Sequence, residues 1–223
     1  MRLKFLALMA ALTISGATPA CANNDTQYWQ TLNVTVALPN NFKVNNETVL
    51  RSGDANGFSE FENNFMVGKK LGKVVTVWLG YTFDPFYTRG AFRVREQRFR
   101  QQVSFDNFAS IGKVKLSGRL RLEQRWRGGQ TGTAWRLRPQ AKATVPIAGK
   151  VTLSVSNELF FDLNNTTFQR VDGIERMRNA AFITVPLNKH VNFEVGYLNQ
   201  QVYFTNRAAE SDNVLTTGLS ASF

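Results

Sequence analysis

The segment from Lys113 to Trp126 alternates between apolar and charged residues almost without interruption. One face of this segment is apolar and comprises Val114, Leu116, Leu120, Leu122 and Trp126. The opposite face is mostly charged and comprises Lys113, Lys115, Arg119, Arg121, Glu123 and Arg125. A period of two places successive side chains on opposite sides of a pleated sheet. The segment therefore predicts a β-strand that separates an apolar environment from a polar one.

Strand-like patterns recur along the chain, and the stripe of an amphipathic helix is absent. We expect strands at 28–38, 42–51, 57–68, 73–84, 93–106, 112–127, 134–146, 150–162, 174–186, 190–204 and 213–223. Such segments suit the roughly 9–11 residues that a tilted strand needs to cross a membrane. After residue 22 no apolar run approaches the length of a membrane helix, so a membrane-embedded form must be a closed barrel. The predicted fold class is all-β, an antiparallel transmembrane β-barrel formed by residues 23–223.

The predicted connections alternate in length. Short turns are expected at 39–41, 71–72, 147–149 and 187–189, and longer polar loops at 84–92, 128–133, 163–173 and 205–212. In outer-membrane barrels the short turns face the periplasm and the long loops face outward. Counted back from a periplasmic C-terminus, the segment 28–38 would begin outside the cell, whereas single-chain bacterial barrels normally have an even strand count. We therefore expect about 10 or 12 strands, with a parity conflict at 28–38.

Residues 1–22 have the pattern of a secretory signal peptide. A positively charged start precedes the short apolar run from Phe5 to Ile14, and Ala20-Cys21-Ala22 fits the small-x-small cleavage rule. Cleavage would start the mature chain at Asn23 and remove Cys21, the only cysteine. The mature protein is then expected to have no disulfide and no thiolate chemistry. Acylation of Cys21, as in a lipoprotein, is the alternative.

The last predicted strand ends the chain on Phe223. Leu219, Ala221 and Phe223 share one face of this strand. A terminal strand with alternate apolar positions and a final Phe resembles the recognition signal that the outer-membrane assembly machinery reads. These three residues are therefore the predicted assembly signal, and the bacterial outer membrane is the predicted location. The expected partners are that machinery, membrane lipid and lipopolysaccharide.

A basic polar face dominates the middle of the chain. Between Arg89 and Arg138 the sequence has eleven arginines and three acidic residues. In a barrel this face lines the lumen, and the predicted polar network comprises Glu96, Arg98, Arg100, Arg119, Arg121, Glu123, Arg125, Arg138 and Glu158. One interpretation is an Arg–Glu ladder that fills a narrow barrel. The other is a wall that attracts anions, as in anion pores. The narrow lumen favours the first, a structural or weakly conducting barrel, with a narrow anion-selective channel as the alternative.

The sequence has few candidate catalytic residues. Histidine titrates near neutral pH and can relay a proton, which makes it the residue expected of an envelope-lipid-modifying enzyme. The single histidine, His190, follows a predicted short turn and has no serine beside it that reads as a nucleophile. Metal-ligand spacing, a phosphate-cradling Gly-rich loop and paired cysteines are absent from the sequence. We therefore expect a non-enzymatic protein without metal or cofactor, with a lipid-modifying enzyme as the alternative.

The net charge constrains the partners. The full chain has a formal charge of +11. A strongly basic balance often indicates nucleic acid, but export makes nucleic acid an unexpected partner here. Lipopolysaccharide phosphates, an anionic solute or the internal polar network are the expected counterparts of the arginines.

Five short motifs occur in a fixed order along the chain. They are Glu96-Gln97-Arg98-Phe99-Arg100, Arg119-Leu120-Arg121-Leu122-Glu123-Gln124-Arg125, Leu137-Arg138-Pro139, Asn157-Glu158-Leu159-Phe160 and Gly196-Tyr197-Leu198-Asn199-Gln200. Together they resemble an uncharacterised family of bacterial proteins catalogued as a domain of unknown function (DUF twenty-four ninety). The resemblance covers most of the mature chain and is clearest from about residue 94 onward. It implies an outer-membrane β-barrel and no established activity.

Overall fold

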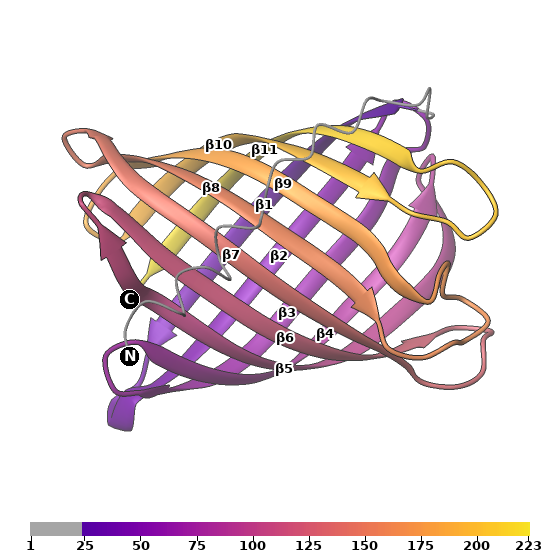
Figure 1. The fold of residues 1–223 in the computed structure, drawn as a ribbon, viewed down its shortest axis with the longest axis horizontal. Coiled ribbons are helices and arrows are strands. Elements are labelled where there is room, and N and C mark those ends of the chain that lie inside the picture. Colours follow the sequence, from indigo (N-terminus) through magenta and orange to yellow (C-terminus); the bar gives the residue numbers. More distant parts are fainter. Residues whose placement is uncertain (1–23) are drawn as a thin grey trace, which may run out of the picture.

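A computed structural model describes residues 24–223, which form a closed barrel of eleven β-strands (Figure 1). The strands are β1 (Asn24–Ala37), β2 (Phe42–Gly53), β3 (Gly57–Leu71), β4 (Val75–Thr88), β5 (Ala91–Ile111), β6 (Val114–Arg127), β7 (Ala134–Ala148), β8 (Val151–Asp162), β9 (Gly173–Pro186), β10 (Val191–Val202) and β11 (Glu210–Ser222). The short 3-10 helix η1 (Pro39–Asn41) connects β1 to β2. No helix within residues 24–223 is long and apolar enough to cross a membrane.

The predicted all-β barrel is confirmed, and each of the predicted strands corresponds to an observed one. The predicted signal peptide 1–22, including Cys21, and the predicted mature start at Asn23 lie outside the described residues. Strand β5 is longer than expected, because its pairing with β6 continues past a bulge between Phe105 and Ala109 as far as Ile111.

The barrel closes through a parallel pair, β1 with β11. Asn24 lies opposite Ser211, and the register continues to Thr35 opposite Ser222. Every other neighbouring pair is antiparallel and follows the order of the sequence. Since β1 and β11 run in the same direction, eleven strands close without an unpaired edge. The parity conflict at 28–38 is thereby resolved: this segment is a full strand, and the count of eleven lies between the two expected values.

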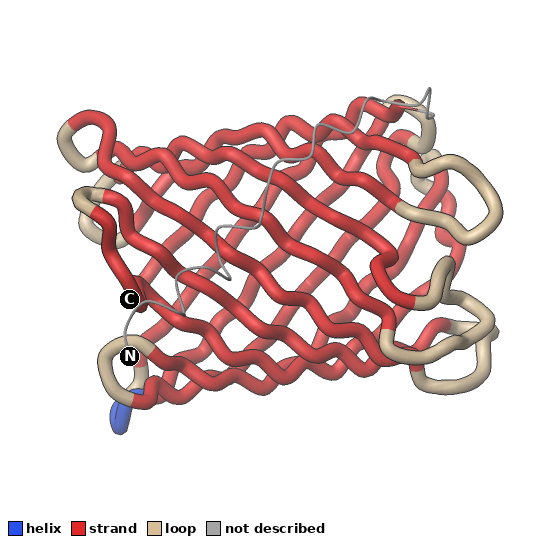
Figure 2. The backbone as a smooth tube through the Cα atoms, in the orientation of Figure 1, coloured by secondary structure: helices blue, strands red, loops and turns tan. Residues whose placement is uncertain are grey.

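The two ends of the barrel differ in the length of their connections (Figure 2). One end carries only short connections and the end of β11, whereas the other carries the long loops 128–133, 163–172 and 203–209 together with the short turns 54–56 and 89–90. The loop predicted at 84–92 is not observed, because β4 continues to Thr88 and β5 begins at Ala91. Arg89 and Gly90 turn the chain with positive φ angles of 50° and 78°, the combination that a type I′ hairpin requires.

The barrel is apolar outside and polar inside. Leu79, Tyr197 and Leu215 are each more than half exposed on the outer surface. Within residues 24–223, twenty-two polar or charged residues are buried against eight apolar ones. A water-soluble protein has the opposite arrangement, since its apolar side chains form the core. Apolar surface of this extent normally contacts lipid or another protein.

A cross-link tests the parallel closure. Leu32 and Leu219 lie opposite each other on the outer surface. In a Cys21→Ser background, the pair Leu32→Cys and Leu219→Cys should form a disulfide on mild oxidation, seen as a mobility change on a non-reducing gel. Cysteines at Leu32 and Leu215 are the control, because four residues along a strand, about 13 Å, exceed disulfide reach. Preferential cross-linking of the control pair would contradict the register.

Candidate functional site

The nine residues predicted for the polar network all lie on the interior face of the barrel. Eight of them are buried, and the Arg119 side chain is 21% exposed. They reach the interior because alternate positions of β5, β6, β7 and β8 face the same way, so Glu96 and Arg100 share a side with Glu123 across the ladder. This arrangement brings arginines and carboxylates of neighbouring strands within hydrogen-bonding distance.

Glu123 is the centre of this network. Its carboxylate lies 3.1 Å from Nε of Arg100, and it accepts hydrogen bonds from Arg136 at 2.6 Å and from Arg138 at 2.8 Å. The strand register explains the contacts, since Glu123 lies directly opposite Arg100 on β5 and Arg136 on β7. Neither Glu123 nor Arg100 has exposed surface.

The contacts of Glu123 extend into a chain of ion pairs that we call the central belt: Glu62, Arg100, Glu123, Arg138 and Glu158. Arg100 donates to Glu62 of β3 at 2.8 Å. Arg138 makes a bidentate contact with Glu158 of β8, with both donor–acceptor distances at 3.1 Å. The belt therefore links β3, β5, β6, β7 and β8 across the interior. Bidentate guanidinium–carboxylate contacts are strong and geometrically specific.

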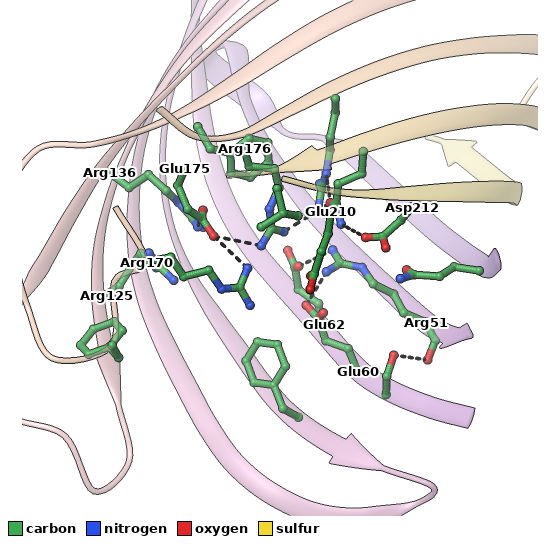
Figure 3. Close-up of a pocket in the computed structure, with 18 of the residues that line it drawn as sticks. Arg51, Glu60, Glu62, Arg125, Arg136, Arg170, Glu175, Arg176, Glu210 and Asp212 are labelled. Atoms are coloured by element: carbon green, nitrogen blue, oxygen red, sulfur yellow. Dashed lines mark hydrogen bonds and ion pairs between the residues drawn. The ribbon is translucent and has the colours of Figure 1, made fainter. Parts of the chain in front are cut away.

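Two further clusters lie between the belt and the long loops. Glu96 contacts Arg98 at 2.6 Å, Arg125 at 2.9 Å and Arg127 at 2.7 Å. Glu175 contacts Arg136, Arg170 and Arg176 at 3.3, 3.2 and 3.1 Å. Figure 3 shows the Glu175 side chain among these arginines. Each carboxylate is thus shared by three guanidinium groups.

Two aromatic side chains inside the barrel are absent from the predicted network. Trp29 lies between Arg51, 4.3 Å from its ring centroid, and Arg178, at 4.8 Å. Phe160 in turn contacts Arg178 at 4.7 Å and Arg138 at 4.1 Å. These cation–π contacts join the two walls of the barrel. The alternation of β8 could have predicted the position of Phe160, because Leu159 and Phe161 face outward and the residue between them must then face inward.

Other charged interior residues missing from the predicted network come from β2, β3 and β4 and from β7, β8 and β9. They are Arg51, Glu60, Glu62, Asp84, Arg136, Asp162, Glu175, Arg176 and Arg178. Among residues 24–223, Glu60, Glu62 and Asp84 form the one acidic group close enough to hold a metal ion. However, Arg51 and Arg98 pair with these same carboxylates, so guanidinium groups take the positions that a cation would need.

Two cavities lie inside the described barrel. The loop-side cavity has a volume of about 420 Å³, with Arg125, Arg136 and Arg176 on one wall and Glu210 and Asp212 on another (Figure 3). The turn-side cavity has a volume of about 350 Å³ and a lining that includes Lys43, Arg100, Gln102, Arg119 and Arg121.

The central belt separates the two cavities. No described residue lines both of them. Glu62 and Arg138 of the belt face the loop-side cavity, and Arg100 faces the turn-side cavity. The belt residues therefore lie at the boundary between the two cavities.

The remaining candidate residues lie at the short-turn end. Nδ1 of His190 is 2.8 Å from the carbonyl oxygen of Ser222, and its ring stacks on Phe223 with 5.2 Å between centroids. His190 lines neither cavity. Leu219 and Phe223 of the predicted assembly signal are 44% and 62% exposed on the outer face, with Ala221 between them.

Removal of the central carboxylate should destabilise the barrel. Glu123→Gln leaves three arginines short of a partner, and loss of one member of a buried ion pair costs about 3–5 kcal/mol. Glu210→Gln is the control, because its pair with Arg207 is largely exposed and contributes about 1 kcal/mol or less. Urea titration, with the folded fraction read from heat-modifiable gel migration, measures both free energies of unfolding. Equal losses would contradict the central role of Glu123.

Comparison with solved structures supports the barrel fold. The NanC porin aligns with 89% of this chain and 99% of its own, at a TM-score of 0.56 and 12% sequence identity. Identity this low shows the fold alone. An anion-selective porin from Comamonas acidovorans aligns with a TM-score of only 0.38, at 13% identity over 81% of this chain and 54% of its own.

Comparison at the sequence level identifies the family. An uncharacterized protein of Methylorubrum extorquens is 28% identical over 171 residues, which are 74% of each chain. The family model described as "Protein of unknown function (DUF2490)" matches residues 26–211, nearly the whole described barrel. The resemblance seen in the ordered motifs is thus confirmed, and this β-barrel protein belongs to the DUF2490 family.

Proposed function

We propose that the protein is a non-enzymatic β-barrel of the bacterial outer membrane whose lumen is closed by the central belt. It would serve as a structural or weakly conducting barrel rather than as an open pore. The observation that supports this proposal is the burial of the belt: Arg100 and Glu123 have no exposed surface, and the cavities on either side share no lining residue within the described chain.

The outer surface supports placement in a membrane. Its apolar side chains suit contact with lipid, and the closed ladder leaves no strand edge unsatisfied among the described strands. By analogy with outer-membrane barrels, the short turns face the periplasm and the long loops face outward. Membrane lipid and lipopolysaccharide are then the surrounding partners. Leu219, Ala221 and Phe223 face outward, where the assembly machinery could read them.

The interior chemistry supports a role without catalysis. The buried carboxylates of the belt each pair with arginines, an arrangement that suits structural ion pairs rather than general acids. His190, on which a lipid-modifying activity would depend, bonds the backbone of Ser222 and stacks on Phe223 at the end of the barrel. We therefore rank an envelope-lipid-modifying enzyme below the structural barrel.

The charges of the cavities favour one second candidate, a narrow anion-selective channel. Nine arginines and seven acidic residues line the loop-side cavity. Three arginines, one lysine and one glutamate line the turn-side cavity. The linings of both cavities thus have more basic than acidic residues. An opening in the belt would join the two cavities into a path that attracts anions.

Conductance measurements distinguish the closed barrel from the channel. The wild-type protein in a planar bilayer should give no steady current. Arg100→Ala shortens a belt side chain that lies against the turn-side cavity and should open an anion-preferring current. Arg178→Ala is the control, because Arg178 lines only the loop-side cavity and has no place in the belt. A steady anion-selective current in the wild type, with selectivity lost in Arg121→Ala, would establish the channel instead.

Cysteine labelling tests the location and orientation. In a Cys21→Ser background, Asn165→Cys in the long loop 163–172 should react with a membrane-impermeant maleimide on intact cells, because Asn165 is exposed. Lys150→Cys, in the turn between β7 and β8, should react only after the outer membrane is permeabilised. Both variants should fractionate with outer membranes. Recovery as soluble periplasmic protein, or labelling of Lys150→Cys alone, would overturn the proposal.

A further inference from the structure

The turn-side cavity has more basic than acidic residues in its lining, and two of the basic residues, Arg100 and Arg119, pair with carboxylates that lie outside that lining. Lys43, Arg100, Arg119 and Arg121 line it, and Glu47 is the only acidic residue among the described residues of its lining. The Glu47 carboxylate accepts a hydrogen bond from the side-chain amide of Asn64 at 3.0 Å. No ion pair joins Glu47 to any of the four basic residues within the described chain.

Arg121 is the residue on which this excess concentrates. It is 6% exposed, and no carboxylate within residues 24–223 forms an ion pair with it. Its Nε donates to the side-chain oxygen of Gln102 at 2.8 Å. Its neighbours across the ladder are Gln102 on β5 and Arg138 on β7, so it lies between a neutral amide and a second positive charge.

The nearby carboxylates are already shared among other arginines. Glu123 contacts Arg100, Arg136 and Arg138. Glu158 contacts Arg119 and Arg138. Neither of them pairs with Arg121, although Glu123 is only two residues away on the same face of β6.

A buried charge without a partner is unfavourable, and an anion from solution would balance it. The cavity beside Arg121 offers the space, and its volume of about 350 Å³ lies in the range of small-molecule sites. Guanidinium groups bind oxyanions through paired hydrogen bonds, and several cations together favour an anion with more than one charge. Arg119 is partly exposed and Ser222 ends β11 here, so the site is reached from the short-turn end.

We propose that the turn-side cavity binds a small oxyanion of the phosphate class, held by Arg121 and Arg119, with Lys43 adding charge. The site goes beyond the proposed function, because it lies on one side of the belt and requires no passage through it. In the proposed orientation the ligand enters from the periplasm.

Binding of inorganic phosphate tests the site. Equilibrium dialysis of the purified barrel in detergent, with radiolabelled phosphate at constant ionic strength in chloride, should show saturable binding. Arg121→Gln should weaken this binding about tenfold or more, as expected for loss of a hydrogen-bonded charge. Arg121→Lys should weaken it less, because the charge remains while the paired geometry is lost.

Arg178→Gln is the matched control. Arg178 is also buried, faces the interior and forms no ion pair within residues 24–223, but it lines the loop-side cavity. Its replacement should leave phosphate binding unchanged. If Arg121→Gln does not fold, Lys43→Gln and Arg121→Lys give the same comparison.

Three results would overturn the proposal: no saturable phosphate binding by the wild type, undiminished binding after the Arg121 and Lys43 replacements, or equal competition by acetate. The test is independent of conductance. A conducting wild-type barrel would refute the closed belt and leave the phosphate measurement intact.

Discussion

An eleven-strand barrel with hairpin connections can close only if its first and last strands run in the same direction. The pairing of β1 with β11 meets this requirement, with Asn24 opposite Ser211 and Thr35 opposite Ser222. In an apolar surrounding every backbone donor and acceptor needs a partner within the protein, so an unclosed edge would be costly. The rest of the structure depends on this seam, because closure defines an interior into which the polar faces of all strands converge.

The interior then poses a problem of charge balance that the strand register solves. Arginines outnumber carboxylates, and each of Glu96, Glu123 and Glu175 is shared by three guanidinium groups. Stability alone does not explain such a network, since well-packed apolar residues often replace buried ion pairs at no loss. Its effect is positional: each of these three carboxylates holds three guanidinium groups in place, and the proposed closure of the lumen depends on this fixed arrangement. Arg121 is the single arginine of β6 that forms no ion pair with a carboxylate among the described residues, and it lines the turn-side cavity.

The sequence predicted the architecture well because alternation is a local signal, and all eleven strands were recognisable from it. The parallel pairing of β1 with β11 could not be predicted in the same way, since pairing of the two chain ends depends on long-range contacts that a local sequence pattern does not contain. The interior site was predictable only in part: the arginine-rich faces of β5, β6 and β7 stood out, whereas the strands that contain Arg51, Glu62 and Trp29 have at most one arginine each. The partners of each arginine could not be assigned either, because Glu62 contacts Arg100 across an intervening strand. Such a contact depends on barrel curvature and side-chain reach rather than on sequence spacing.

The parallel seam also determines the order in which the barrel can form. Every antiparallel pair joins strands that are neighbours in the sequence, so each needs only a short connection to close. The seam joins the two ends of the described chain, which are separated in sequence by nine other strands. Contacts of such large sequence separation form slowly. We therefore expect the ladder between β1 and β11 to be the last to form, and the arginines and glutamates of the interior to lose their hydration together at that final step.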